Sequence, residues 1–260
     1  MNSHTGKKIY DESFYNQQMD GSYRSATLYV KHLLKIFKPH SVADLGCGKG
    51  TWLKAFKENG VEKLVGFDGN WIKQEEIVDQ AVTFFPIDLN KPFLKAVERF
   101  DLAISVEVAE HLKEESSKTF VDNITALSDV VMFGAAYTDQ GGLDHINEQP
   151  ATYWAKMFIE NGYTPYDIFR STFWDNQDIE WWYQQNTFLY VKNNSKINQT
   201  LKEVGYQPIS NIKFMNCIHP NLYSRWVSTA QSSPIKLLLK AIIPKTLLPF
   251  VRRLKRQVLK

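Results

Sequence analysis

Short apolar runs alternate with amphipathic stretches along much of this chain, and this alternation limits the possible folds more than any other feature. The runs have the length of buried strands, and the stretches between them carry apolar residues at helical spacing. Strands that alternate with helices form right-handed crossovers and a parallel sheet with helices on both faces. The predicted strands are SVADL (41–45), KLVGF (63–67), VTFF (82–85), DLAISV (101–106) and DVVMFGAA (129–136), and the predicted helices between them are TWLKAFKENG, NWIKQEEIVDQ, KPFLKAVERF and EESSKTFVDNITAL.

Further elements flank this alternating region. Helices are predicted from Ser25 to Phe37 and over ATYWAKMFIENGY, where apolar residues recur at near-helical spacing. The apolar segments TPYDIFRSTFW and TFLYVKN are candidates for the last strands. The whole pattern predicts an α/β fold, a Rossmann-like seven-stranded doubly wound sheet over residues 1–193, followed by an extension over 194–260.

The extension ends in a segment of unusual charge. Residues 234–260 hold eight of the 31 Lys and Arg residues but none of the 28 acids. Pro244 and Pro249 break any long helix there, so two short basic amphipathic helices are predicted. Such helices suit an anionic membrane surface, and the alternative is a tail that packs on its own body or on a partner subunit. No nucleic-acid partner is expected, because no aromatic-basic surface accompanies the charge.

The composition also indicates a compartment. Cys47 and Cys217 are the two cysteines, which is too few for a disulfide framework. The N-terminus has no apolar signal region, and no run approaches the ~20 apolar residues that span a bilayer. We therefore expect a cytoplasmic protein, with residues 234–260 as a peripheral contact to the inner membrane face.

A glycine-rich turn follows the first predicted strand. The sequence there is Asp44-Leu45-Gly46-Cys47-Gly48-Lys49-Gly50-Thr51-Trp52. Glycines let a ligand approach the backbone where a Cβ would collide. Dinucleotide folds prefer G-x-G-x-x-G, whereas the third glycine here comes one residue early and an acid precedes the turn. The pattern therefore favours S-adenosylmethionine over a dinucleotide, and a tight turn without a ligand is the structural alternative.

Polar side chains follow the next three predicted strands. The second strand ends at Asp68-Gly69, where a carboxylate can accept hydrogen bonds from both ribose hydroxyls. Asp88-Leu89 follow the third strand, and Asp88 is a candidate for the adenine amino group. Glu107 follows the fourth strand, near the expected methionine end of the cofactor. Because these ends meet at one edge of a parallel sheet, we expect a single cofactor site there.

The region from about Phe14 to Asn186 resembles a family of bacterial class I methyltransferases of surface-polysaccharide biosynthesis. The stretches that carry the resemblance are FYNQQMDGSYRSA, VADLGCGKGTWL, GFDGNWI, FDLAISVEVAEHL, FVDNITALSDVVMFGAA, QGGLDHINEQPATYW and WWYQQNTFLY. The resemblance implies a cytoplasmic enzyme of capsule or related biosynthesis that methylates a sugar hydroxyl or glycan substituent, nucleotide- or lipid-linked. It also implies that residues 1–38, with Tyr15 and Ser25, cover the cofactor, and that Cys47, Gly50 and Trp52 belong to its site.

Two histidines lie where an acceptor would be activated. A hydroxyl acceptor must lose a proton, and histidine is the commonest general base. His145, within GGLDHINEQ, is our hypothesis for the base, and a loop histidine capped by its neighbours is the alternative. Asn147, Glu148 and Gln149 either order this loop or bind acceptor hydroxyls. His111 is the other candidate base, and it can also face the cofactor or be structural.

Aromatic residues gather near the end of the predicted domain. Trp174, Trp181, Trp182 and Tyr183 can stack on a sugar ring, or they can pack a lid onto the core. The six histidines are scattered in the sequence, so no metal site is predicted.

Other functions share parts of this pattern. The same chemistry on a small metabolite, a phosphate-type substituent or a lipid headgroup would keep every cofactor residue. A non-catalytic cofactor-binding interaction module is a further alternative. A nicotinamide oxidoreductase is disfavoured by the glycine spacing.

Overall fold

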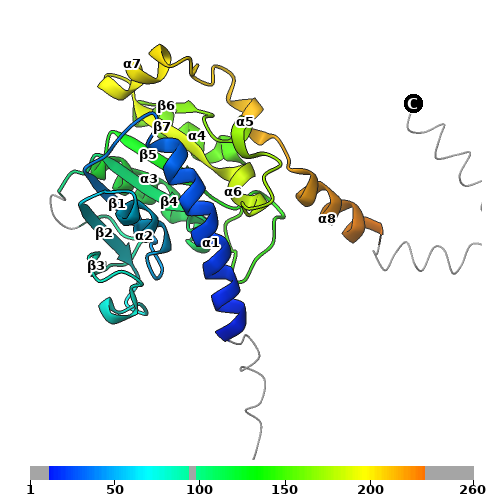
Figure 1. Cartoon of the computed structure of the whole chain (residues 1–260). Coiled ribbons are helices and arrows are strands. Elements are labelled where there is room, and N and C mark those ends of the chain that lie inside the picture. Colours follow the sequence, from blue (N-terminus) through cyan, green and yellow to red (C-terminus); the bar gives the residue numbers. More distant parts are fainter. Residues whose placement is uncertain (1–11, 94–97, 232–260) are drawn as a thin grey trace, which may run out of the picture. The chain divides into compact units, whose positions relative to one another are not determined.

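The structure of the chain, a computed structural model, describes residues 12–93 and 98–231 (Figure 1). Its strands are β1 (Ser41–Leu45), β2 (Lys63–Asp68), β3 (Thr83–Pro86), β4 (Leu102–Val106), β5 (Val130–Gly134), β6 (Tyr163–Tyr166) and β7 (Phe188–Lys192). Its α-helices are α1 (Glu12–Leu33), α2 (Thr51–Glu58), α3 (Ser117–Leu127), α4 (Ala151–Glu160), α5 (Arg170–Phe173), α6 (Trp181–Asn186), α7 (Lys196–Glu203) and α8 (Pro220–Gln231). The 3-10 helices are η1 (Gln74–Glu76), η2 (Ala109–His111), η3 (Glu114–Ser116) and η4 (Ile212–Asn216).

The seven described strands form one sheet in the order β3-β2-β1-β4-β5-β7-β6. Strands β1 to β5 pair in parallel, and β7 runs antiparallel to both β5 and β6. The carboxyl ends of β1 to β5 therefore meet at one edge. The strand order reverses between β1 and β4, which is where open α/β sheets bind ligands. The predicted α/β fold with a seven-stranded doubly wound sheet is confirmed.

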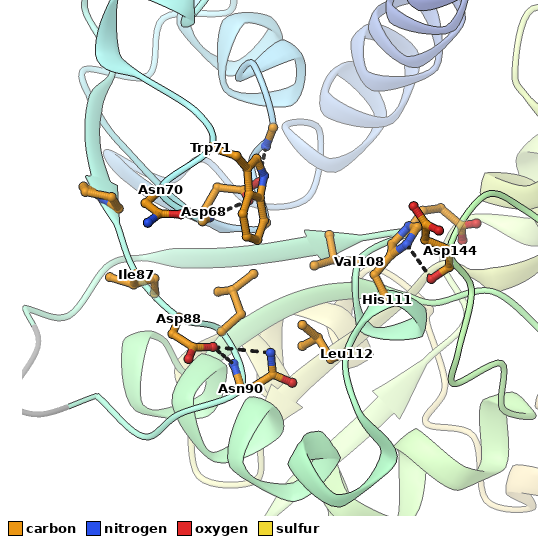
Figure 2. A pocket seen from close by; sticks show the side chains of 16 residues that line it. Asp68, Asn70, Trp71, Ile87, Asp88, Asn90, Val108, His111, Leu112 and Asp144 are labelled. Carbon is orange, nitrogen blue, oxygen red and sulfur yellow. Dashed lines mark hydrogen bonds between the residues drawn. The ribbon is translucent and has the colours of Figure 1, made fainter. Parts of the chain in front are cut away.

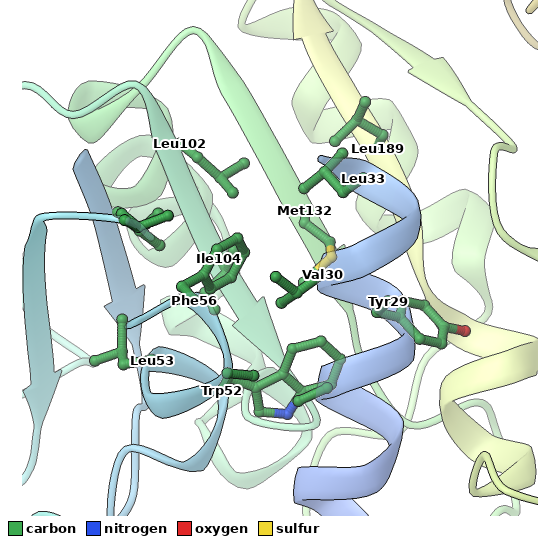
Figure 3. Close-up of a cluster of buried hydrophobic side chains, with 14 of the residues drawn as sticks. Tyr29, Val30, Leu33, Trp52, Leu53, Phe56, Leu102, Ile104, Met132 and Leu189 are labelled. Carbon is green, nitrogen blue, oxygen red and sulfur yellow. The ribbon is translucent and has the colours of Figure 1, made fainter. Parts of the chain in front are cut away.

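Apolar side chains fill both faces of the sheet. On one face α1 and α2 cover the central strands, and Figure 3 shows Val30 and Phe56 of these helices beside Ile104 and Met132. On the other face α3 and α4 contribute a second cluster, which includes Phe120, Phe133, Trp154, Phe158 and Tyr190. Because both faces are covered, the central strands are apolar on both sides, as their continuous apolar runs predicted.

The helix predicted over residues 70–80 is wrong, because this segment contains only η1. Gln74 explains the difference. Its Nε2 donates to the Val82 carbonyl at 2.9 Å, and the Phe84 amide donates to its Oε1 at 3.0 Å. These bonds tie the segment to the edge strand β3 in place of a helical ladder. The helix predicted over KPFLKAVERF falls in part on residues 94–97, which lie outside the described residues.

The chain divides into two compact units after His219, not at the predicted boundary of 193. Residues 194–219 belong to the first unit. Leu201 of α7 is fully buried in its core, and the Tyr166 hydroxyl donates to Asn198 Oδ1 at 2.6 Å. Arg170 donates to the carbonyls of Phe214 and Met215.

Helix α8 is the described part of the second unit, and the basic segment 234–260 lies outside the described residues. The membrane contact predicted for that segment therefore stays a prediction. Among the described helices, none has the length and hydropathy to cross a membrane.

Candidate active site

The predicted glycine-rich turn joins β1 to α2 at the carboxyl edge of the sheet. Gly46, Gly48 and Gly50 have φ values of +85°, +51° and +80°, which glycine adopts without steric cost. A Cβ at Gly46 would lie 2.3 Å from Val108 Cγ1. A Cβ at Gly48 would have no atom within 4 Å. The turn is therefore tightly packed at Gly46 and borders open space at Gly48.

This difference predicts unequal effects of alanine at the two glycines. Both substitutions cost about 1–2 kcal/mol for a left-handed residue, and Gly46→Ala adds about 1–3 kcal/mol of overpacking against Val108. Gly46→Ala should therefore lower the melting temperature roughly 2–12 °C further than Gly48→Ala. Differential scanning calorimetry of both variants measures this difference. Equal melting temperatures would show that Val108 does not constrain the turn.

Asp68 closes the turn at the end of β2. Its carboxylate accepts hydrogen bonds from the amides of Gly48 at 2.7 Å and Gly69 at 2.6 Å. Burial raises the pKa of Asp68, and these two amides oppose the shift. Asp44 is also buried, and burial followed by the charge of Asp68 raises its pKa. A carboxylate has about four lone-pair sites, so Asp68 keeps acceptor capacity for a ligand.

A cavity of about 910 Å³ lies against this turn, at the carboxyl ends of β1, β2, β3 and β4. Figure 2 shows Asp68 and Asp88 on one side of the cavity and His111 and Asp144 on the other. The predicted residues that line it are Gly46, Gly48, Asp68, Gly69, Asp88, Leu89, Glu107 and His111. The fold thus brings the side chains at four predicted strand ends to one cavity.

The sequence reasoning missed several lining residues. Asn70 and Trp71 follow Asp68 directly, and Asn90 follows Asp88. The Trp71 ring lies against Gly69, where an added Cβ would be 2.1 Å from the ring, and the side chain is 72% exposed. The position of Trp71, two residues after the predicted ligand-binding glycine Gly69, was the sequence signal that could have indicated its place at the cavity.

Other predicted cofactor residues do not line the cavity. Trp52 is buried against Tyr29 and Tyr183, with ring centroids 5.7 and 5.4 Å away. The Ser25 hydroxyl donates to the Gly21 carbonyl at 2.8 Å inside α1. Cys47 and Gly50 shape the turn from its buried side. Tyr15 lies in α1, but its side chain is outside the described structure.

Glu107 links three segments at the end of β4. It has a left-handed φ of +57°, and its carboxylate accepts hydrogen bonds from Gln140 Nε2 at 2.7 Å and Asn186 Nδ2 at 2.9 Å. Burial raises the pKa of Glu107, and these two amide donors oppose the shift. Glu107 therefore lines the cavity while it holds α6 and the loop after β5 in place.

His111 and His145 contact each other although they are far apart in the sequence. Their ring centroids are 4.8 Å apart, with the planes at 89°. The amides of Ile146 and Asn147 donate to the Glu110 carbonyl at 2.9 and 3.0 Å, which ties the loop after β5 to η2. The histidines are scattered in the sequence, but the fold brings His111 and His145 together by pairing the two segments that carry them.

Each of these histidines has one ring nitrogen engaged. His145 Nδ1 lies 2.7 Å from Glu148 Oε1, and His111 Nδ1 lies 3.3 Å from the Asp144 carbonyl oxygen. Burial lowers the pKa of His111, and the neighbouring His145 lowers it further. Both causes favour the neutral imidazole, the form that a proton acceptor requires.

The residues that follow His145 order its loop. Asn147 Nδ2 donates to Ser117 Oγ at 3.0 Å, and Gln149 Nε2 donates to Asn147 Oδ1 at 3.1 Å. Glu148 Oε1 also accepts from the Gly141 amide at 2.7 Å. These residues were predicted either to order the loop or to bind acceptor hydroxyls, and the contacts that they make order the loop.

The predicted aromatic cluster makes packing contacts. Trp174 and Trp181 pack around His219, with centroid distances of 4.9 and 6.1 Å. Trp182 is half-buried against the core, and Tyr183 is buried with its hydroxyl 3.2 Å from Ser22 Oγ. None of the four lines the cavity in the described part of the chain.

Comparison with known proteins identifies the class. The methyltransferase domain family matches residues 15–211, and the chain belongs to this family. DesVI from Streptomyces venezuelae is similar with a TM-score of 0.52 at 12% identity, over 73% of this chain and 100% of that one. An O-methyltransferase family protein from Burkholderia thailandensis has a TM-score of 0.50 at 14% identity, over 72% and 61%. At these identities the two likenesses show the fold.

The cofactor of this family and fold is S-adenosylmethionine, and the residues present fit it. The open face of Gly48 leaves room for a ligand against the backbone. Asp68 would hold the ribose hydroxyls with its remaining lone pairs, and Asp88 and Leu89 would meet the base.

Proposed function

We propose that the chain is an S-adenosylmethionine-dependent O-methyltransferase that acts on a sugar hydroxyl or glycan substituent in bacterial surface-polysaccharide biosynthesis. One observation carries the proposal. A single cavity has the glycine turn and Asp68 on one side and His111, backed by His145, on the other. The first group suits the cofactor, and the second suits an acceptor that must lose a proton.

The chemistry divides between the cofactor and the chain. S-adenosylmethionine supplies an activated methyl group, and the protein aligns the acceptor oxygen behind it, which is a positioning effect. In this proposal His111, which lines the cavity and is backed by His145, takes the proton of the acceptor hydroxyl. Glu148 holds the His145 ring through Nδ1, and His145 in turn packs against His111, which lines the cavity.

The sugar acceptor is supported by the resemblance carried by the loop GGLDHINEQ (141–149) and by a polar side chain of that loop on the cavity wall. Asp144, on the same side of the cavity as His111, offers a carboxylate that can accept hydrogen bonds from hydroxyl groups.

Titration calorimetry with S-adenosylhomocysteine tests the cofactor, and methyl transfer from radiolabelled S-adenosylmethionine tests the acceptor. We expect binding by the wild-type chain and transfer to a nucleotide- or lipid-linked sugar. Transfer only to a small metabolite, a phosphate-type substituent or a lipid headgroup would overturn the sugar acceptor. A folded chain that binds no S-adenosylhomocysteine would overturn the enzyme and favour an interaction module.

Asp68→Ala should weaken S-adenosylhomocysteine binding at least about a hundredfold. The variant loses two hydrogen bonds to a charged group, each worth about 1.5–3 kcal/mol. Asp175→Ala is the matched control, because Asp175 is exposed and does not line the cavity. Since Asp68 also accepts from the turn amides, Asp68→Asn provides a milder variant, for which we expect weakening of at least about tenfold. Unchanged affinity in both variants would remove Asp68 from the site.

A further inference from the structure

Glu110 is a buried acid whose environment the methyl-transfer chemistry does not explain. It is 0% exposed, and neither carboxylate oxygen has a hydrogen-bond partner among the described residues. An unpartnered buried carboxylate is costly, so such groups ordinarily pair with a cation or bind a metal.

The two histidines of the candidate active site adjoin this carboxylate. One ligand-type atom from each of Glu110, His111 and His145 lies within 4.8 Å of the others. His145 Nε2 is 4.0 Å from Glu110 Oε1. This separation exceeds a hydrogen bond and leaves room for an ion between the three groups. We propose that Glu110, His111 and His145 bind a divalent transition-metal cation at the acceptor side of the cavity.

The ring nitrogens of the two histidines that would not bind the ion have the partners that are usual for metal-binding histidines. A ligating histidine usually donates its other ring N–H to a carboxylate or a backbone carbonyl, which fixes the tautomer. His145 Nδ1 has the Glu148 carboxylate at 2.7 Å, and His111 Nδ1 has the Asp144 carbonyl at 3.3 Å. Both acceptors favour a proton on Nδ1 and therefore a lone pair on Nε2, the nitrogen that would face the ion.

The cluster is held rigidly before any ion binds. The Glu110 carbonyl accepts from two amides of the histidine loop, and Glu148 also accepts from the Gly141 amide. At Gly142 an added Cβ would lie 2.2 Å from His145 Nε2, so the loop backbone packs directly on the ring. Side chains positioned by such contacts are what a specific ion site needs.

The donor set indicates which ions fit. Imidazole nitrogens suit Zn²⁺ and Fe²⁺, carboxylate oxygen suits Mn²⁺, and two histidines with one carboxylate leave coordination positions open. His111 and Asp144 line the cavity, so the open positions face the acceptor side. The role of the ion rests on the proposed function. With the ion bound, the histidines would serve as its ligands and not as bases: the ion would ligate the acceptor hydroxyl and lower its pKa, and the proton would leave to solvent. The C–S bond then breaks with its electron pair on sulfur as the C–O bond forms.

Electron paramagnetic resonance of the full, chelator-treated chain titrated with Mn²⁺ tests the site directly. We expect one Mn²⁺ per chain, displaced by Zn²⁺, which binds such sites more tightly. Glu110→Gln and His145→Ala should each weaken Mn²⁺ binding at least tenfold. Glu114→Gln and His40→Ala remove an exposed acid and an exposed histidine and should leave it unchanged. Absence of binding, or equal binding by all five proteins, would overturn the site.

Thermal melting distinguishes a variant that has lost the metal site from a variant that does not fold. Mn²⁺ should raise the melting temperature of the wild-type chain, because an ion that binds the native state stabilises it. Metal-free Glu110→Gln should melt no lower than the metal-free wild type, since an isosteric amide replaces an unpaired buried acid. It should show no shift with Mn²⁺, and a wild-type-sized shift would contradict the proposal.

S-adenosylhomocysteine titration of the same samples separates the two proposals. If the wild type binds S-adenosylhomocysteine but not Mn²⁺, the metal inference fails and the proposed function stands. If the folded wild type binds Mn²⁺ but not S-adenosylhomocysteine, the proposed function fails and the metal site stands.

Discussion

His145→Ala should reduce methyl transfer about 10²- to 10⁴-fold, the usual contribution of a positioned acid–base group, because the His145 ring packs on His111 and positions that histidine on the cavity wall. The same variant should bind S-adenosylhomocysteine within about twofold of the wild type, because His145 is not among the residues that line the cavity. Its contacts are with His111, Glu148 and the loop that carries it. The loss should therefore appear in kcat, as removal of an interaction made in the transition state.

His40→Ala is the control for this prediction, since His40 is exposed and lies at the opposite end of β1 from the glycine turn. Steady-state kinetics with the acceptor found in the sugar panel give kcat and KM. Near-normal turnover with normal cofactor affinity would remove His145 from catalysis. Rescue by imidazole would indicate a proton-transfer role, whereas dependence on added Mn²⁺ would indicate loss of a cation ligand.

The cofactor side of the cavity was predictable because it depends on local sequence and on one topological rule. Asp68 and Asp88 each follow a buried strand, and parallel strands end at one edge. The glycines at 46 and 48, predicted as part of a ligand-binding turn, adopt the positive φ values that glycine tolerates. Nothing beyond the order of the strands was needed to place these residues together.

The acceptor side depends on contacts between distant segments, which sequence spacing does not show. His111 and His145 meet because the Glu110 carbonyl binds the amides of the loop after β5. The orphan carboxylate of Glu110 is visible only once the fold has buried it. Trp52, which follows the glycine-rich turn, was predicted to belong to the cofactor site. It lies in α2, however, and its ring packs into the core against Tyr29 and Tyr183.

Phe158→Ala should destabilise the first unit by about 3–5 kcal/mol, the range for removing a fully buried phenylalanine. Phe158 is 0% exposed and stacks on Tyr190, with ring centroids 3.9 Å apart and planes at 17°. It also meets Phe133 edge to face at 5.2 Å. Because these partners belong to β5 and β7, the ring joins α4 to the strands beneath it, and its loss leaves a cavity that the stiff sheet cannot fill.

A domain of this size loses roughly 2–4 °C of melting temperature per kcal/mol, so the expected shift is about 6–20 °C. Ile159→Ala, the next residue of α4, is the control; its side chain is 44% exposed and should cost about 1 kcal/mol or less. Calorimetry measures both shifts, and equal shifts would show that the stacked rings contribute little. Since Phe158 does not line the cavity, the folded variant at low temperature should bind S-adenosylhomocysteine like the wild type. Weakened binding there would mean that this face of the sheet positions the strand ends that hold the cofactor.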